Sequence, residues 1–371
     1  MTRLPIRCIP FDLRSALAAA VLCTTAYASG ACLADDSTPP ASTDAASAAV
    51  AWPQFRGAEA KGLSSAPAPT SWDLETGKNV LWRIDVPGLG HSAPIVWGDR
   101  VFLTTAVREQ GDQSLKPGLY GDIDPVTDEG VHRWLVIAYD RASGEELWRR
   151  EAHRGVPAIQ RHTKATHANS TPATDGQRVV AFLGSEGLHA YDLDGEELWS
   201  VDFGVLDSGY FAAPEAQWGF GSSPVLHDGK VIIQVDVQEN SFLAALDADT
   251  GEVIWRTPRR DVPTWSSPTV IDDGDGGLQV VINGYKRLGG YSFATGEPLW
   301  WMPGGGDIPV PTPFEHQGRI VFSSSHGLSS PIFVVDQAAR GDVSLSGGAS
   351  SNEAIPWAHF RGGAYMPTPI A

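Results

Sequence analysis

Short apolar runs separated by glycine- and proline-rich turns make up most of this chain. Val179–Leu183, Val231–Val235 and Gln279–Ile282 are rich in the β-branched residues that favour strands. Pairs of residues suited to tight hairpins stand between such runs, namely Gly98-Asp99, Asp175-Gly176, Asp228-Gly229 and Gln317-Gly318. The chain holds 40 Gly and 27 Pro but only 3 Met, a composition that disfavours a helical bundle. The pattern therefore predicts an all-β fold.

Two sequence elements recur along the chain. The first is a Ser/Thr-x-Pro or Ser-Pro step that leads into a strand, as at Ser92-Ala93-Pro94 and Ser222-Ser223-Pro224. The second is a turn in which Asp accepts hydrogen bonds from backbone amides and Gly supplies a left-handed residue, followed by a Trp that can fill the gap between neighbouring sheets. The members of the second element are Asp140, Gly144 and Trp148; Asp192, Gly195 and Trp199; Asp247, Gly251 and Trp255; and Gly296 with Trp300.

The spacing of these elements predicts a WD40-like β-propeller. Several intervals are about 45 residues, the length of one four-stranded blade. We expect about five complete blades, which end near Trp148, Trp199, Trp255, Trp300 and Leu345. Val80–Trp82 has the register of an outer strand that no inner strands precede, and 367–371 begins a further inner strand. From these two segments we expect a C-terminally incomplete propeller that lacks about one to three blades.

These motifs resemble those of a known family. The turn elements are similar to the tryptophan-docking repeats of pyrroloquinoline-quinone (PQQ) dehydrogenases, and Trp52–Gly57 with Gly90–Val96 resembles the secreted PQQ-binding-like β-propeller repeat proteins, which include the BamB-type envelope scaffolds. The resemblance covers residues 52–371. It implies a propeller of about seven or eight blades, usually without a demonstrated quinone or enzyme activity.

The N-terminal residues are typical of an export signal. Positively charged positions precede an apolar run over 16–28, and small residues follow. This layout predicts a signal peptide over residues 1–34, cleaved near Ala28 or Ala34. The run is too short to favour a transmembrane helix. Lipidation at Cys32 is the weaker alternative, because Leu does not stand three residues before it.

The domain organisation follows from this boundary. All three cysteines lie in the predicted leader, so the mature chain would contain no disulfide and no Cys-ligated metal. Residues 35–51 are mostly Ala, Ser, Thr, Pro and Asp and predict a flexible linker. Residues 52–371 form the expected propeller domain. We expect localisation in the periplasm or cell envelope, or outside the cell.

The charge balance excludes some function classes. With 27 Lys+Arg against 44 Asp+Glu, the formal net charge is −17, which disfavours binding to nucleic acid. The favoured function is a monomeric, non-catalytic scaffold without a cofactor, which binds an envelope protein or a small ligand at its rim. The alternative that the resemblance suggests is a PQQ- and calcium-dependent dehydrogenase of alcohols or sugars. A third hypothesis is a carbohydrate-binding propeller.

Residues just before each inner strand should face one mouth of the propeller channel. They mix aromatic and polar groups that could converge on a ligand, and they comprise His91, Asn169, Phe220, Trp265, Val310 and Tyr365. Trp218 or Trp265 would be the aromatic platform if a quinone were bound. The simpler interpretation is that all of these side chains only pack the rim.

Three segments carry residues of metal-ligating type. Asp272, Asp273 and Asp275 lie in a run that resembles a calcium loop, although a hairpin turn is already required there. The other two segments hold His153, His162 and His167, and Asp122, Asp124, Asp128 and Glu129. We interpret the histidine segment as a solvated loop and the second as an acidic surface loop, and predict no metal in either.

Overall fold

The computed structural model describes residues 51–371 except 65, 112 and 117–123. All of them belong to the compact unit Thr43–Ala371. The predicted signal peptide and almost all of the predicted linker lie outside the described residues.

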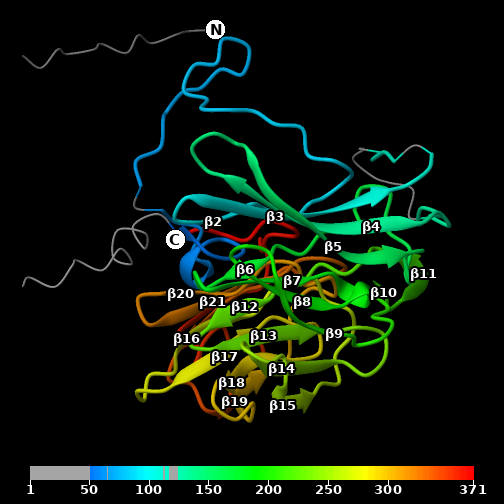
Figure 1. Cartoon of the computed structure of the whole chain (residues 1–371). Coiled ribbons are helices and arrows are strands. Elements are labelled where there is room, and N and C mark those ends of the chain that lie inside the picture. The colour runs from blue at the N-terminus through cyan, green and yellow to red at the C-terminus, as the bar shows by residue number, and fades with distance from the viewer. Residues whose placement is uncertain (1–50, 65, 112, 117–123) are drawn as a thin grey trace, which may run out of the picture. The chain divides into compact units, whose positions relative to one another are not determined.

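Five antiparallel blades follow one another along the chain (Figure 1). We number them 1 to 5 in sequence order. Their strands are, in blade 1, β2 (Ile95–Trp97), β3 (Arg100–Arg108), β4 (His132–Asp140) and β5 (Glu146–Gly155); in blade 2, β6 (Ala173–Thr174), β7 (Arg178–Phe182), β8 (Leu188–Asp192) and β9 (Glu197–Val201); in blade 3, β12 (Val225–His227), β13 (Lys230–Val235), β14 (Phe242–Asp247) and β15 (Val253–Pro258); in blade 4, β16 (Thr269–Asp272), β17 (Leu278–Ile282), β18 (Leu288–Ser292) and β19 (Pro298–Met302); and in blade 5, β20 (Phe314–His316), β21 (Arg319–Ser323), β22 (Ile332–Asp336) and β24 (Trp357–His359).

Short elements complete the described architecture. They are the strands β1 (Ala51–Trp52), β10 (Gly209–Tyr210), β11 (Ala213–Gln217) and β23 (Gly341–Asp342), and the 3-10 turns η1 (Ala58–Ala60) and η2 (Gly184–Glu186). β1 extends blade 1 on its inner edge, and β10 pairs with β11 in a separate hairpin between blades 2 and 3. The expected all-β propeller of four-stranded blades is confirmed.

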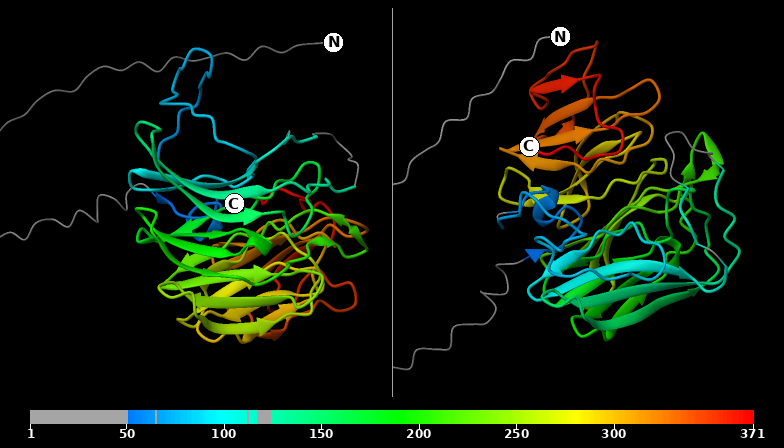
Figure 2. Two further views of the ribbon diagram at one scale, coloured as in Figure 1. Left: turned by 45° about the vertical axis from the view of Figure 1, so that its right-hand side comes forward. Right: turned by 90° about the horizontal axis from the view of Figure 1, so that it is seen from above.

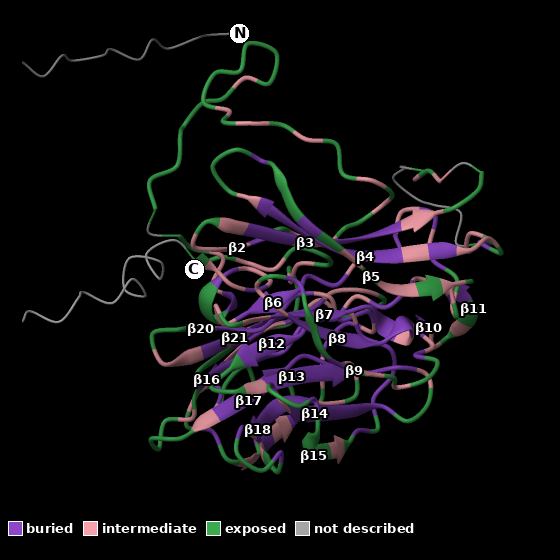
Figure 3. Cartoon of the chain, viewed as in Figure 1, coloured by how far each residue is buried: buried purple, intermediate pink, exposed green. Residues whose placement is uncertain are grey.

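The hydrophobic core lies between neighbouring blades. In blades 1 to 4 the second and third strands are mostly buried, whereas the outermost strands have exposed positions (Figure 3). One cluster joins Phe182 of blade 2 to Phe242 of blade 3, and comparable clusters join the other adjacent pairs. The blades therefore stabilise each other rather than folding around one central core.

The repeated tryptophans contact the turn of the following blade. The Trp148 indole donates a hydrogen bond to the Leu193 carbonyl at 2.8 Å, directly after Asp192. A Cβ placed on Gly195 would lie 2.7 Å from the Trp148 ring. Trp199 and Trp255 repeat this arrangement on the next two turns, with donation to Ala248 and Phe293. The Asp of each turn accepts backbone N–H groups, as Asp140 does from Ala142 and Ser143.

Two expectations about tryptophans need correction. Val80–Trp82 forms no strand, and Leu81 is 86% exposed. Trp82 nevertheless donates to the Arg141 carbonyl at 2.9 Å and covers the turn of blade 1 at Gly144. Trp300 makes no direct contact of this kind. Its indole donates to Gln279 Oε1, and the Gln279 amide donates in turn to the carbonyl of Gln337, so that a side chain is interposed.

The fourth strand of blade 5 also differs from expectation. We predicted that this blade would end near Leu345, but its outer strand is β24 at Trp357–His359. The turn glycine Gly341 instead belongs to β23, which pairs in parallel with β19 of blade 4. The chain thus returns to blade 4 before it completes blade 5.

The proline steps explain why Ser and Thr recur before the inner strands. The residue before each proline donates its backbone N–H to the side-chain hydroxyl of the equivalent residue in the next blade, at 2.9–3.4 Å. The series runs from Ala93 to Thr171, Ser223, Ser267, Thr312 and Thr368. This line of hydrogen bonds links the inner edges of all five blades and satisfies buried donors.

The segment 51–62 crosses from blade 1 to the opposite side of the domain. The Pro53 carbonyl accepts from Thr174 in blade 2. Arg56 donates to the carbonyl of Pro369 at 2.9 Å, and Lys61 forms an ion pair with Glu315 of blade 5. Figure 2 shows this segment in blue between the cyan–green and the orange sheets.

Candidate functional site

A group of aromatic rings gathers where the loops between and within blades 2 to 5 meet. We call it the aromatic mouth; it consists of Tyr210, Trp218, Trp265, His326 and Tyr365. Tyr210 stacks on Trp218 with ring centroids 5.3 Å apart, and Trp218 lies 5.2 Å from Trp265. His326 contacts Tyr210 edge-on and stacks on Tyr365. Five rings from four segments of the chain thus form one continuous surface, since Tyr210 and Trp218 share the insertion between blades 2 and 3.

A carboxylate fixes the rings at the centre of the aromatic mouth. The hydroxyl of Tyr210 donates to Asp307 at 2.7 Å, and His326 Nδ1 lies 2.6 Å from the other oxygen of the same carboxylate. Burial together with this hydrogen bond raises the pKa of Tyr210 to about 12, so its hydroxyl stays protonated at neutral pH. Tyr365 remains 43% exposed at the edge of the group. The arrangement offers stacking surface and one acid, and both oxygens of that acid are already engaged.

Three of the predicted channel-mouth residues, Trp218, Trp265 and Tyr365, meet in this group. Asn169 lies next to it and donates to the Phe220 carbonyl at 3.0 Å. His91 takes no part in the ring contacts of the aromatic mouth, and its Nε2 lies 2.7 Å from the Lys164 carbonyl. Sequence reasoning missed Tyr210, Asp307 and His326, because none of them belongs to a repeated motif. Tyr210 is in β10, and the Tyr210-Phe211 pair in the insertion between blades 2 and 3 was the available signal.

The donors near the aromatic mouth do not fit a quinone–calcium site. Calcium requires several oxygen ligands, whereas the ring contacts of the aromatic mouth bring in a single carboxylate, that of Asp307. A planar ring between Tyr210 and Trp218 would need a separation of about 7 Å, which is larger than their 5.3 Å. The side chains of the aromatic mouth therefore do not supply, as arranged, the ligands and the ring separation that a quinone–calcium site needs.

The predicted calcium loop is a hairpin turn. Asp273 Oδ1 accepts the backbone N–H groups of Asp275 and Gly277 at 2.9 Å. Asp275 pairs with Arg340 at 2.5 Å, and Asp272 Oδ1 accepts from the N–H of Gly274. The three carboxylates serve the turn and its contact with blade 5. Arg340 offsets part of their negative charge, and the backbone N–H groups of the turn occupy oxygens that a calcium ion would need.

A second polar group lies buried between the loops of blade 1 and blade 2. Ligand atoms of Asp128, His132 and His167 lie within 4.8 Å of one another. Asp128 accepts from Arg161 Nε at 2.9 Å and lies 3.1 Å from His167 Nε2. Burial alone would raise the pKa of Asp128, but His167 and Arg161 outweigh it and lower the pKa to about 2. Burial lowers the pKa of His132.

The structure corrects part of each sequence-based interpretation of this region, whereas Asp124 and Glu129 are exposed, as expected for an acidic surface loop. Asp128 is buried rather than part of an acidic surface loop, and His167 lies against it. His153 is in β5 and packs edge-on against Trp134, while His162 contacts Trp218. Asp122 lies outside the described residues. His132 was missed because it occupies the first position of a strand.

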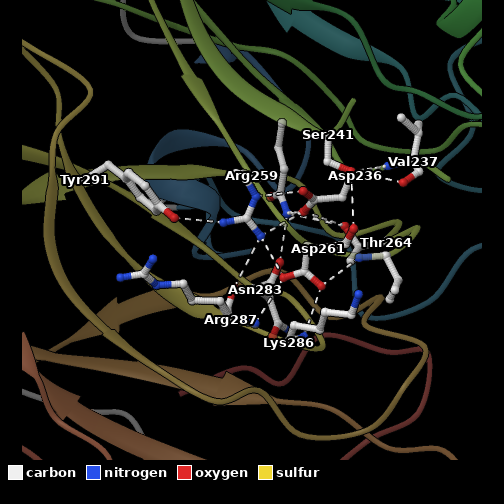
Figure 4. Close-up of polar contacts among 12 residues, drawn as sticks. Asp236, Val237, Ser241, Arg259, Asp261, Thr264, Asn283, Lys286, Arg287 and Tyr291 are labelled. Carbon is white, nitrogen blue, oxygen red and sulfur yellow. Dashed lines mark hydrogen bonds and ion pairs between the residues drawn. The ribbon is translucent and has the colours of Figure 1, made fainter. Parts of the chain in front are cut away.

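A third polar group ties blade 3 to blade 4 (Figure 4). Arg259 is bidentate to Asp236, at 2.6 and 3.0 Å, and also donates to Asp261 at 3.0 Å. The hydroxyl of Tyr291 in β18 accepts from Arg259 Nη1. All three charged side chains are at least 98% buried. Burial raises the pKa of Asp236, while Arg259 opposes that shift.

Comparison with known proteins assigns the family. The family profile described as outer membrane protein assembly factor BamB matches residues 132–340, which is more than half of the chain. The chain belongs to this BamB family of PQQ-like repeat proteins. The resemblance seen in the sequence is thereby confirmed at the level of family and fold.

The BamB family member described here is also similar to quinone-dependent enzymes. The quinohemoprotein alcohol dehydrogenase ADH IIB of Pseudomonas putida is 33% identical over 126 residues, which are 33% of this chain and 17% of that protein. The crystal structure of BamB from Moraxella catarrhalis aligns with a TM-score of 0.40 at 17% identity and covers 57% of this chain and 59% of its own. The quinohemoprotein alcohol dehydrogenase from Comamonas testosteroni aligns with a TM-score of 0.49 at 17% identity and covers 80% and 48%.

The chain spans less than two thirds of the length of each of these relatives. Within the described residues, no helix is long and apolar enough to cross a membrane.

Proposed function

We propose that this chain is an exported, non-catalytic β-propeller that binds another protein of the cell envelope through its aromatic mouth. The observation that carries the proposal is the continuous ring surface from Tyr210 to Tyr365, held in place by Asp307. Aromatic side chains with partly exposed faces are enriched at protein interfaces. The mouth also lacks an acid free to act as a catalytic base.

Family membership supports the same proposal. The family is described as an assembly factor for outer membrane proteins, and the leader predicted over residues 1–34 would deliver the chain to the envelope. We assign residues 35–51 to a linker and 52–371 to the propeller domain. We further assign Trp148, Trp199 and Trp255 to tryptophan-docking motifs, in keeping with their indole hydrogen bonds to the next blade.

Site-specific photo-crosslinking in the envelope tests the proposal. A photoreactive residue replaces Tyr365, which is 43% exposed in the aromatic mouth, or Ile254, which is 45% exposed on the outer strand β15. We expect a discrete protein adduct from position 365 that position 254 does not give, and that Trp218→Ala weakens. Equal adducts from both positions would contradict a specific site at the mouth.

The alternative is a PQQ- and calcium-dependent dehydrogenase, which the similarity to ADH IIB favours. It predicts that purified chain incubated with PQQ and Ca²⁺ keeps quinone absorbance after gel filtration and reduces a dye when an alcohol or aldose is added. Retained quinone absorbance together with dye reduction would show that the chain is an enzyme and not a non-catalytic scaffold. A protein that emerges free of quinone supports the scaffold.

A further inference from the structure

We propose that Asp128, His132 and His167 form a binding site for a divalent transition-metal ion of the zinc class. One ligand atom from each side chain lies within 4.8 Å of the other two, so small side-chain rotations would bring all three to the bonding distance of about 2 Å from one ion. The exposed fractions are 2% for the Asp128 side chain, 4% for that of His167 and 0% for His132. The proposal is independent of the function assigned to the aromatic mouth.

The orientation of His132 is the observation that points to a ligand. Its Nδ1 lies 2.8 Å from the Gly130 carbonyl, which can only accept, so Nδ1 carries the proton. In the neutral ring this leaves a lone pair on Nε2, and Nε2 is buried without a hydrogen-bond partner. A histidine whose second nitrogen donates to a backbone carbonyl while the first is left for a metal is the usual arrangement in metal sites.

The backbone of His167 is anchored by the indole of Trp134. The Trp134 indole donates to the His167 carbonyl at 2.9 Å, and Trp134 is fully buried. The ring of His167 lies edge-on to that of His132, with centroids 5.1 Å apart. Both imidazoles therefore come from rigid surroundings, β4 and the loop anchored on Trp134, and the site does not depend on a rearrangement of the backbone.

The charge around the group decides which ions it would take. Asp128 is paired with Arg161 at 2.9 Å and lies 3.5 Å from Arg108. The two guanidinium groups repel a dication and compete for the one carboxylate, so hard ions that bind through oxygen, such as Ca²⁺ and Mg²⁺, are disfavoured. Ions that bind strongly to neutral imidazole, such as Zn²⁺, can still gain from His132 and His167. We expect moderate rather than very tight binding.

The group borders a cavity on its carboxylate side. This cavity, of about 240 Å³, is lined by Asp128 and Arg161 but by neither histidine. Three protein ligands would leave the fourth position of a tetrahedral ion for water. Three potential ligands, one of them oriented by the Gly130 carbonyl, are what a zinc-class site requires.

Titration of the untagged, EDTA-treated chain with Co²⁺, followed by competition with Zn²⁺, tests the site. We expect one equivalent of Co²⁺ to give visible ligand-field absorption that Zn²⁺ abolishes and Ca²⁺ does not. His132→Gln and His167→Gln should each weaken Zn²⁺ binding by at least about tenfold. His227→Gln is the matched control, because His227 is exposed in β12, and should change the affinity less than about twofold.

Two further readouts keep the outcome independent of folding defects. Thermal unfolding without metal shows whether each variant is folded. X-ray absorption at the zinc edge of the wild-type chain should reveal two imidazole ligands and oxygen. A shell of oxygen alone, Zn²⁺ affinity unchanged in folded His132→Gln, or an absence of stoichiometric binding would each overturn the proposal.

Discussion

Glu186 is a buried carboxyl group at the end of η2. It is 9% exposed, and its Oε1 accepts the backbone N–H of Ala158 at 3.1 Å. No cation pairs with it among the described residues. Burial raises its pKa from 4.5 to about 7, so the folded protein holds a proton that the unfolded chain has already released.

The pKa of Glu186 makes stability depend on pH. Because the folded state binds more protons than the unfolded state between pH 4.5 and about 7, the free energy of unfolding falls as the pH rises through this window, by up to about 3 kcal/mol. Glu186→Gln keeps the hydrogen bond to Ala158 and removes the titration. We expect this variant to be more stable than wild type at pH 8 and nearly equal at pH 4.5.

Urea unfolding at several pH values measures this difference. Glu252→Gln, which changes an exposed carboxyl in a blade 3 turn, is the control and should leave the pH profile unchanged. A Glu186→Gln profile that parallels wild type would mean that this carboxyl does not titrate with a raised pKa.

Sequence patterns identified part of the aromatic mouth but not its centre. Trp218, Trp265 and Tyr365 could be found because they stand near the proline steps, whose position in a blade is fixed. Asp307 and His326 lie in loops whose path depends on tertiary packing. Their spacing in the sequence therefore does not predict that they contact Tyr210. The same limit hid His132 and the burial of Asp128.

At the scale of single elements, the Asp–Gly turns are clamped by the tryptophan of the preceding blade. Gly195 has φ +83°, and a Cβ there would lie 2.7 Å from the Trp148 ring. Gly229 has a similar φ of +69° but no atom within 4 Å of such a Cβ. Both alanine variants incur backbone strain, and only Gly195→Ala must also displace an indole. We expect Gly195→Ala to destabilise by about 1–3 kcal/mol more than Gly229→Ala.

Equilibrium unfolding of the two glycine variants gives this difference directly. Trp148 fluorescence should shift in Gly195→Ala and stay unchanged in Gly229→Ala. Equal destabilisation of both would show that the indole contact contributes nothing beyond the backbone conformation.

The proline steps offer a second test between elements. Ser223 Oγ accepts the N–H of Thr171 at 3.0 Å, whereas the hydroxyl of the adjacent Ser222 has no hydrogen-bond partner. Ser223→Ala leaves a buried donor unsatisfied and should cost about 1–3 kcal/mol. Ser222→Ala removes no such bond and should be close to neutral. Calorimetric unfolding compares the two, and a loss of similar size in both would refute the role of the hydroxyl line.

The position of the outer strand of blade 5 was predicted incorrectly, and the neighbouring elements explain why. The first four blades carry Trp at a fixed distance from the turn, so their outer strands could be located. After Asp336 the turn glycine is Gly341, but the chain pairs there with β19 and reaches the outer strand only at Trp357. A parallel strand that returns to the previous blade has no local sequence signal. The role of Gln279 between Trp300 and the turn of blade 5 also has no local sequence signal, because Gln279 and Gln337 are 58 residues apart in the chain.

On the scale of the whole molecule, the buried charges of Figure 4 join two blades at one point. Arg259, which follows β15, balances Asp236 and Asp261, and the Asp261 carboxylate also accepts backbone N–H groups of Lys286 and Arg287 in blade 4 at 3.0 Å. Two carboxylates thus share one guanidinium inside the domain. Such a group is costly to break, because removal of one partner leaves a buried charge without its counter-ion.

Arg259→Met should therefore destabilise the domain by about 3–5 kcal/mol, because Asp236 and Asp261 lose their counter-ion while buried. Without the guanidinium, burial raises the pKa of Asp236 further, so the folded variant takes up a proton and its stability falls as the pH rises. Denaturant unfolding from pH 5 to 8 measures both effects. Asp236→Asn in the same chain should restore part of the loss and flatten the pH dependence.

The control is Arg256→Met, since Arg256 is exposed three residues earlier and lies over Phe242. If Arg259→Met behaved like Arg256→Met at every pH, the network would be a solvated surface feature, and the blade junction would depend on apolar packing alone.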